Sequence, residues 1–426
     1  MAQQTTLLRR TRLFATRCIV TCLLLTTSLS WATNDREWVG TWMAAPDQVG
    51  PPLKAQTIRQ VIRSSIGVKR VRIRLSNQYG KEPLELGAIH LATHTNGAAI
   101  TPGSDHVVTF SRKPRITIPV GETVLSDPID MTIAPLQELA ISMFLPSGII
   151  ASTQHGTGMQ TVYSVLEKDV TAAIDLPQPE KDDSRYFLAD IEVSGARDGH
   201  AIVVIGDSIT DGVGSTNDKN ARWTDILAER LHAEARLSSI AVLNAGISGN
   251  RILNDGVEPF VGPSMLTRLE RDVLSKPGVK WVMVFGGIND ISAANVLHSS
   301  KDKVTVAQLI QGMTSLINRS HEKGLKVWGA TILPNGGTVG IIGHSANGEK
   351  MRQELNAWIR QSAAFDAVID VDRVLASPDR PAQLAPEFDS GDHTHPNDAG
   401  YRAIADAVDL KLFSDTLKTT TRRNGK

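Results

Sequence analysis

The chain has almost no cysteine, and its two cysteines, Cys18 and Cys22, both lie within the first 32 residues. This segment has arginines at its front, an apolar stretch from Cys18 to Ser30 and small residues at Ser30 and Ala32, which is the pattern of a secretory signal peptide. We predict that residues 1–32 are removed and that the protein is exported to the periplasm or the extracellular space. The remaining chain would have no disulfide, no thiol nucleophile and no cysteine metal site.

An excess of basic charge is also absent, since 45 Lys and Arg balance 45 Asp and Glu. Removal of residues 1–32 takes away four arginines and no acids, which leaves 41 basic against 45 acidic residues and a formal charge of −4. This balance argues against a nucleic-acid partner. The apolar stretch of the signal segment is too short to span a bilayer well, so we expect no membrane span in the mature chain.

Helical periodicity is missing from residues 36–196, where period-two alternation dominates instead. The clearest example alternates Val71, Ile73 and Leu75 with arginines, as a half-buried strand does. Short runs of the same kind follow, separated by Gly, Pro, Asn and Asp turns. They are Leu84–Ala92, His106–Phe110, Arg115–Ile118, Glu138–Leu145 and Tyr186–Val193. We predict that residues 36–196 form an antiparallel β-sandwich of jelly-roll type, in which the polar positions are solvated strand faces.

The pattern changes at Gly199 to strand, loop and helix in repetition. The predicted strands are Ala201–Ile205, Ile240–Leu243, Val279–Phe285, Leu325–Thr331 and Ala367–Val371, and the predicted helices are Arg222–Arg236, Val304–Lys323, Glu349–Ala364 and Asn397–Leu412. Such alternation builds a parallel sheet covered by helices on both faces. Residues 199–416 are therefore expected to form a second, α/β domain, and residues 417–426 a frayed tail.

The most informative stretch is Ala201–Gly212, with the sequence AIVVIGDSITDG. A buried strand followed by a glycine turn places Ser208 at the carboxyl end of that strand, where open α/β sheets hold their ligands. Ser208 is thus a candidate nucleophile, although a lone serine at this position is also typical of a turn cap.

A second polar stretch, GDHTHPN, spans Gly391–Asn397 just before a predicted helix. Its i, i+3 spacing lets the Asp392 carboxylate orient the His395 ring while the other ring nitrogen faces outward. The same pair is compatible with a helix cap beside a surface histidine. Asp392, His393 and His395 could also be metal ligands, but no further ligand cluster or HExxH pattern supports that alternative.

Two further glycine-containing and asparagine-containing turns follow predicted strands. They are NAGISGN at Asn244–Asn250 and GIND at Gly287–Asp290. Glycine lets a backbone N–H approach a ligand closely, and an asparagine side chain offers another donor. Each turn by itself is also typical of an ordinary strand ending.

Taken together and in this order, the four blocks resemble those of the SGNH/GDSL hydrolase family. Position by position, the resemblance implies that Ser208 is the nucleophile, His395 the base and Asp392 its orienter. It further implies that Gly249, Asn289 and the Ser208 backbone N–H are oxyanion donors, with no cofactor and no metal. It also implies the flavodoxin-like, three-layer parallel sheet of SGNH proteins over about half of the chain. His393 departs from the family, which often has a small or apolar residue there, so the choice of base between the two histidines stays open.

Phrases around the blocks, among them GTWMAAP, RVRIRLSNQYG and SGDHTHPNDAGY, look like a two-domain bacterial branch related to xylan-esterase-like and aryl-esterase-like proteins. The leading hypothesis is an exported carboxylic-ester hydrolase that acts through an acyl-enzyme on short acyl esters of small molecules or polysaccharides. Two alternatives stay open: an O-acyltransferase that uses the same acyl-enzyme, and a non-catalytic carbohydrate-binding protein. The intact set of Ser208, Asp392 and His395 argues against the latter.

Overall fold

The computed structural model describes residues 38–196, 198–256, 261–296, 302–339, 343–414 and 417. The predicted signal peptide at 1–32 and, apart from residue 417, the predicted tail lie outside these ranges. The described residues belong to one compact unit, Arg36–Lys426. Among them, no helix combines the length and the apolar character that crossing a bilayer requires.

The first part of the chain, up to Ser194, is built from antiparallel sheets, as predicted. One sheet runs in the order β1-β17-β4-β10 with β11 also on β4, and a second in the order β15-β14-β3-β12-β6-β7 with β8 on β6. Smaller sheets are formed by β16-β13-β2 and by β5-β9. The strands are β1 (Trp38–Met43), β2 (Gln48–Gly50), β3 (Gln56–Arg63), β4 (Val68–Ser76), β5 (Leu84–Leu86), β6 (Ile89–Asn96), β7 (Ala99–Ile100), β8 (His106–Val107), β9 (Ile116–Ile118), β10 (Thr123–Leu125), β11 (Ile129–Ile133), β12 (Glu138–Leu145), β13 (Ser152–His155), β14 (Val162–Leu166), β15 (Glu180–Asp182), β16 (Arg185–Tyr186) and β17 (Leu188–Ser194). The jelly-roll connection and the domain boundaries stay predictions.

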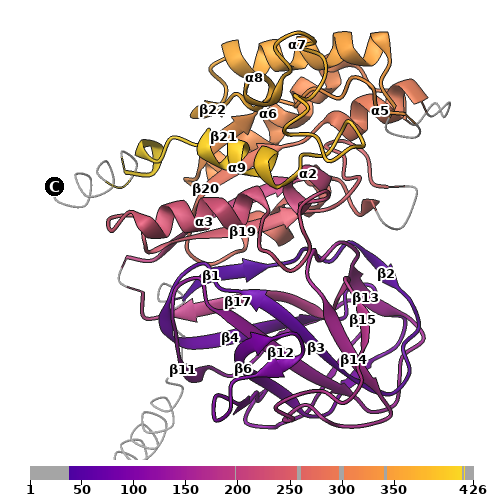
Figure 1. The fold of residues 1–426 in the computed structure, drawn as a ribbon, viewed down its shortest axis with the longest axis vertical. Coiled ribbons are helices and arrows are strands. Elements are labelled where there is room, and N and C mark those ends of the chain that lie inside the picture. The colour runs from indigo at the N-terminus through magenta and orange to yellow at the C-terminus, as the bar shows by residue number, and fades with distance from the viewer. Residues whose placement is uncertain are drawn as a thin grey trace, which may run out of the picture. The chain divides into compact units, whose positions relative to one another are not determined.

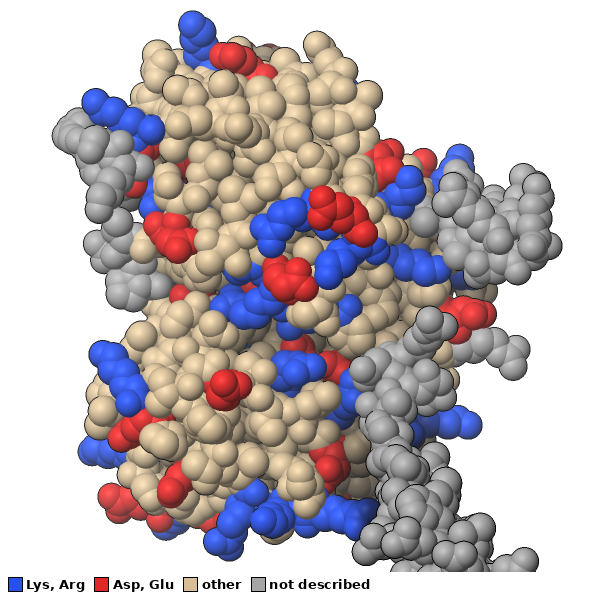
Figure 2. Space-filling view, turned by 180° about the vertical axis from the view of Figure 1, so that it is seen from behind, with Lys and Arg blue, Asp and Glu red and all other residues tan. Residues whose placement is uncertain are grey.

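The polar face of β4 is not simply solvated, in contrast to our expectation. Arg72 forms an ion pair with Glu192 of the neighbouring strand β17 at 2.5 Å, and its guanidinium lies 4.1 Å from the ring centroid of Trp38. Arg74 binds the other oxygen of Glu192 at 2.6 Å. The alternation predicted the strand correctly, but cross-strand charges and a tryptophan cover its polar side. Elsewhere on the surface, Figure 2 shows basic and acidic side chains interspersed over one face of the molecule.

The second part of the chain forms a five-stranded sheet in which every pairing is parallel. Its order, β19-β18-β20-β21-β22, is 2-1-3-4-5 when its strands are counted along the chain, which is the flavodoxin-like order. The strands are β18 (His200–Gly206), β19 (Ile240–Gly246), β20 (Val279–Phe285), β21 (Lys326–Ala330) and β22 (Ala367–Ile369). The helices are α2 (Ser208–Asp211), α3 (Trp223–Ala233), α4 (Met265–Leu269), the π-helical η3 (Glu270–Leu274), α5 (Ile288–Val296), α6 (Val306–Glu322), α7 (Ala346–Gln361), α8 (Val371–Leu375) and α9 (Asp398–Asp406).

Helices cover both faces of this sheet, because its interior strand β18 is apolar on both sides. Ile202 and Val204 of β18 pack in one buried cluster with α3, α8 and α9, and α3 and α9 lie side by side in Figure 1. Val203 and Ile205 face the other way, into a cluster that includes α4, α6 and α7. The predicted α/β layering is thus confirmed. The carboxyl ends of β18, β19 and β20 lie together at one edge.

Three local expectations were wrong. Residues 208–211 form a helical turn and not an open polar turn, because the Asp207 side chain accepts the N–H of Ile209 and caps it. Asn289 lies in the first turn of α5 and not in a loop. The sequence of Glu37–Pro51, EWVGTWMAAPDQVGP, predicts a short, turn-rich segment, but its described part holds β1 and β2.

The antiparallel part packs directly against the α/β part. Gly40 of β1 approaches Leu243 of β19 so closely that an added Cβ would lie 2.7 Å from its Cδ1. The Ser65 hydroxyl donates to the Val242 carbonyl at 3.0 Å, and Arg63 pairs with Glu229 of α3 at 2.8 Å. A single buried apolar cluster contains residues of both parts. The antiparallel part therefore supports β19, the strand that leads into the NAGISGN block.

Candidate active site

Ser208 is presented at the carboxyl end of the interior strand β18. The strand ends at Gly206, and α2 begins immediately after the capping residue Asp207. A Cβ on Gly206 would lie 2.2 Å from Thr210 Oγ1 and 2.8 Å from the Phe285 carbonyl, so only glycine lets α2 fold back at this point. The serine is therefore fixed on a tight strand-to-helix turn.

His395 connects Ser208 to Asp392, although the serine and the histidine are 187 residues apart in the chain. Its Nε2 lies 2.8 Å from Ser208 Oγ, and its Nδ1 lies 2.5 Å from Asp392 Oδ2. Asp392 Oδ1 accepts the backbone N–H groups of Thr394 and His395 at 2.9 and 2.8 Å. The carboxylate thus holds both the histidine ring and its loop.

The same contacts determine the charge on Asp392. Partial burial opposes ionisation of this carboxyl, but the hydrogen bonds from the His395 ring and from the two backbone N–H groups outweigh it and hold its pKa well below the usual range. An ionised Asp392 accepts a hydrogen bond from the Nδ1–H group of His395. The remaining ring nitrogen is then free to accept the serine proton.

His393 takes a different partner. Its ring Nδ1 lies 2.6 Å from Asp389 Oδ2, and its backbone N–H also donates to Asp389. The side chain is more than half exposed. Of the two histidines in this block, His395 is therefore the one that the structure joins to Ser208. Within the described ranges, no three His, Cys, Asp or Glu side chains are grouped as metal ligands.

The two blocks predicted to supply oxyanion donors are joined to each other. The Asn289 side-chain amide donates to the Asn250 carbonyl at 3.0 Å, directly beside Gly249. Gly249 has a φ of +75°, and a Cβ there would lie 2.4 Å from Val261 Cγ1. Asp290 accepts the N–H of Ile252 at 2.8 Å, and burial raises the pKa of this carboxyl to about 6. The roles of Gly249 and Asn289 as donors stay predictions.

A buried arginine that the sequence analysis did not single out ties these blocks together. Arg268 of α4 has no exposed side-chain surface. Its guanidinium donates to the carbonyls of Gly206 and Ala245 at 2.9 and 2.8 Å and to Asn250 Oδ1 at 3.1 Å. No motif surrounds Arg268, so only its position in the fold identifies it.

A known protein family matches the part of the chain that contains these residues. The model of the GDSL-like lipase/acylhydrolase family matches residues 204–403, a range that contains all four blocks. The matched residues make up slightly less than half of the chain. The GDSL-like acylhydrolase domain predicted from the four blocks is confirmed, and with it the assignment as a carboxylic ester hydrolase.

Solved structures similar to the chain cover about half of it. An acetylxylan esterase from Geobacillus stearothermophilus is 23% identical and covers 49% of this chain and 92% of its own, with a TM-score of 0.37. A carbohydrate acetylesterase from Sinorhizobium meliloti is 17% identical and covers 50% of this chain and 99% of its own, with a TM-score of 0.40. The aryl esterase of M. smegmatis is 18% identical and covers 51% of this chain and 99% of its own, with a TM-score of 0.39. No curated protein matches the chain.

Proposed function

We propose that the protein is an exported serine esterase that hydrolyses short acyl esters, including O-acetyl groups on carbohydrates, through an acyl-enzyme. The observation that carries this proposal is the continuous chain of contacts from Ser208 through His395 to Asp392, at 2.8 and 2.5 Å. Nucleophile, base and orienter are all within hydrogen-bond distance, as acyl transfer to serine requires.

In the first half of the reaction, Ser208 Oγ attacks the ester carbonyl while its proton passes to His395 Nε2. The resulting imidazolium is stabilised by the ionised Asp392. The tetrahedral intermediate carries a negative oxygen, for which we assign the backbone N–H groups of Ser208 and Gly249 and the Asn289 amide as donors. Its collapse breaks the ester C–O bond, and His395 returns the proton to the leaving alcohol.

In the second half, water takes the place of the alcohol. His395 accepts a proton from the water as it attacks the acyl-enzyme, and a second tetrahedral intermediate forms against the same donors. Collapse releases the carboxylic acid, and the proton returns to Ser208. If a sugar hydroxyl attacks in place of water, the same steps give O-acyl transfer.

A pocket with both polar and apolar lining beside the histidine loop offers hydrogen-bonding groups to an alcohol that carries hydroxyl groups. The pocket has a volume of about 330 Å³, and its lining includes Arg380, Gln383, Asp389 and His393. Charged and amide side chains of this kind suit a sugar better than an aliphatic chain. The sequence phrases that resemble those of xylan-esterase-like and aryl-esterase-like proteins favour the same substrate class, and the pattern of residues 1–32 supports export.

A panel of p-nitrophenyl esters of increasing acyl length, run beside acetylated xylan, tests the proposal. We expect the highest kcat/KM on the acetyl ester and release of acetate from the polymer. Ser208→Ala is expected to lower kcat by about 10⁶-fold without a change in thermal unfolding, because only binding and oxyanion effects remain. A folded Ser208→Ala variant with wild-type turnover would exclude the mechanism. Failure of the wild type to cleave any ester would favour a carbohydrate-binding protein.

A further inference from the structure

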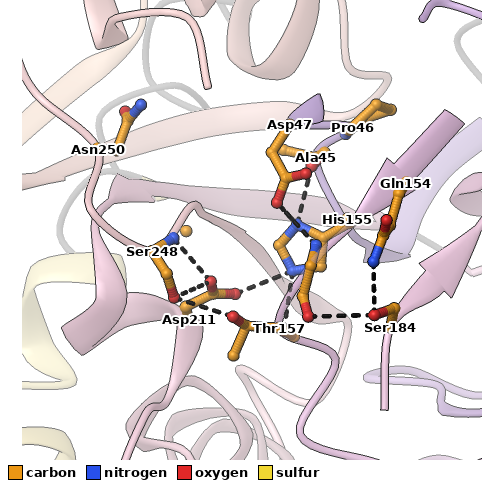
Figure 3. A network of polar contacts seen from close by, with 12 residues as sticks. Ala45, Pro46, Asp47, Gln154, His155, Thr157, Ser184, Asp211, Ser248 and Asn250 are labelled. Carbon is orange, nitrogen blue, oxygen red and sulfur yellow. Dashed lines mark hydrogen bonds and ion pairs between the residues drawn. The ribbon is translucent and has the colours of Figure 1, made fainter. Parts of the chain in front are cut away.

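A buried histidine of the antiparallel part lies against the GDSITDG block. His155 is the last residue of β13, and its ring lies between Asp47, in the β1–β2 loop, and Asp211 of α2 (Figure 3). Its Nδ1 is 2.9 Å from the Ala45 carbonyl and 3.4 Å from Asp47 Oδ2. Its Nε2 is 2.9 Å from the Thr157 carbonyl and 3.0 Å from Asp211 Oδ1.

All four of these neighbours are hydrogen-bond acceptors. A neutral imidazole has one N–H and one lone pair, so either tautomer would direct a lone pair at a carbonyl oxygen and a carboxylate. Only the imidazolium gives both nitrogens a proton to donate. Burial opposes this charge, but Asp211 and Asp47 outweigh burial and raise the pKa of His155 to about 9. His155 is therefore a buried cation at neutral pH.

The contacts of the His155 cation extend through Asp211 to the turn that is proposed to hold an oxyanion donor. While Asp211 Oδ1 binds His155, its Oδ2 accepts both the backbone N–H of Ser248 at 2.9 Å and the Ser248 hydroxyl at 2.8 Å. The Ser248 hydroxyl also lies 3.1 Å from Thr157 Oγ1, which ties the turn to the segment after β13 a second time. Ser248 immediately precedes Gly249, whose N–H is the assigned donor.

We propose that His155 is a positioning residue for ester hydrolysis: it holds the Asp211 carboxylate in place, and Asp211 fixes the Ser248–Gly249 turn that presents an oxyanion donor. The antiparallel part of the chain thus contributes to the active site without touching substrate. An oxyanion donor must be placed within a fraction of an ångström of the developing charge, so a loosened turn slows the chemical step more than it weakens substrate binding. This inference rests on the proposed function.

The test compares His155→Gln with His90→Gln. His90 is a matched control, because it pairs with Asp105 at 2.7 Å and both residues lie within the antiparallel part. On p-nitrophenyl acetate we expect His155→Gln to lower kcat about 10- to 100-fold with KM nearly unchanged. His90→Gln should remain within twofold of the wild type. A kcat of folded His155→Gln within twofold of the control would overturn the proposal.

A double-mutant cycle examines the route through Ser248. Ser248→Ala removes one of the two hydrogen bonds to Asp211 and should lower kcat by a smaller factor. If both residues act through Asp211, Ser248→Ala should lower kcat by a smaller factor in the His155→Gln variant than in the wild type. Fully additive losses would contradict the shared route.

Amide hydrogen exchange separates this inference from the proposed function, because it needs no turnover. We expect the Ser248 amide to exchange at least about 10-fold faster in His155→Gln than in His90→Gln, with the β18 amides unchanged. Unchanged Ser248 exchange would overturn the positioning role even in an active esterase. An active Ser208→Ala would exclude the proposed mechanism and leave this readout valid.

If His155→Gln does not fold, the Asp211→Asn variant is used in its place for the measurement of amide exchange at Ser248. One oxygen of the carboxylate is replaced by an NH₂ group, which must face either the His155 ring N–H or the Ser248 N–H, and both are donors. Faster exchange at Ser248 would support the proposal, and unchanged exchange would overturn it.

Discussion

Two imidazoles lie close to the nucleophile block, one in each part of the chain, and they differ in what their ring nitrogens face. His395, in the α/β part, has a carboxylate on Nδ1 and the Ser208 hydroxyl on Nε2. His155, in the antiparallel part, has acceptors on both nitrogens. A hydroxyl can give up a proton to a ring nitrogen, whereas a carbonyl or a carboxylate cannot.

This difference separates a proton carrier from a fixed charge. His395 can alternate between neutral and protonated forms, because the protonated form is the one that arises when Ser208 loses its proton. His155 keeps both protons, and its partner Asp211 is almost completely buried, while Asp392 is about half exposed. Each histidine pairs with an aspartate. The pair at His395 thus supports chemistry, and the pair at His155 supports rigidity.

The largest expected effect comes from removing the proton carrier. His395→Ala should lower kcat about as far as Ser208→Ala does, by roughly 10⁶-fold, because nucleophile and base act as a unit. His393→Ala is the matched control from the same block, and it should keep most of the activity because its ring pairs with Asp389. Steady-state kinetics on p-nitrophenyl acetate would measure both. If the two variants exchanged behaviour, the assignment of the base would be wrong.

A smaller loss is expected from Asn289→Ala, which leaves both histidines in place. Removing one oxyanion donor should reduce kcat by roughly 10²- to 10³-fold, about 3 to 4 kcal/mol, with little change in KM. Asn289 also donates to the Asn250 carbonyl, so thermal unfolding must be measured on the same sample.

Asn289→Asp is the companion variant, and it should be at least as damaging because it brings negative charge towards the oxyanion. A well-folded Asn289→Ala enzyme within threefold of the wild type would remove Asn289 from the site. Gly249 and the Ser208 amide would then be the remaining assigned donors.

The sequence predicted the α/β part well for a physical reason. Buried parallel strands are continuous apolar runs, so β20 was located at its observed bounds, Val279–Phe285, and β18 within one residue at each end. The pairing of Ser208 with His395 was implied by the resemblance of the four blocks to the SGNH/GDSL hydrolase family and not by the sheet, because the histidine block precedes α9 and does not end a strand. The short helix α2 was missed because its four residues are too few to show a period.

Residues that join elements far apart in the chain could not be predicted in this way. His155 is 56 residues from Asp211 and belongs to a four-residue strand without any motif. Arg268 contacts the ends of two strands from a helix of five residues. Local patterns report which face of an element is buried, but they do not report which distant carbonyls and carboxylates will meet there.

The smallest expected effect is on stability and follows from the fixed charge. The folded-state pKa of His155 is about 9 and its ordinary value about 6.5, so its charge contributes stability that is fully present below about pH 6.5 and is lost as pH rises through about 9. The shift corresponds to at most about 3 kcal/mol.

Two carboxylates act on His155 and one arginine acts on those carboxylates, and the pKa of Asp47 lies below this pH window. Asp211 of α2 and Asp47 of the β1–β2 loop lie against the ring, Arg268 of α4 acts on both carboxylates from farther away, and burial raises the pKa of Asp47 to about 6. Urea unfolding of the wild type and of His155→Gln at pH 6, 8 and 10 would measure the contribution. We expect the difference in unfolding free energy between the two to be largest at pH 6 and to shrink towards pH 10. The difference between the wild type and His90→Gln, measured at the same pH values, serves as the reference for a general loss of stability at alkaline pH. A difference that grew with pH would mean that the ring is neutral when buried, and the contrast between the two histidines would fail.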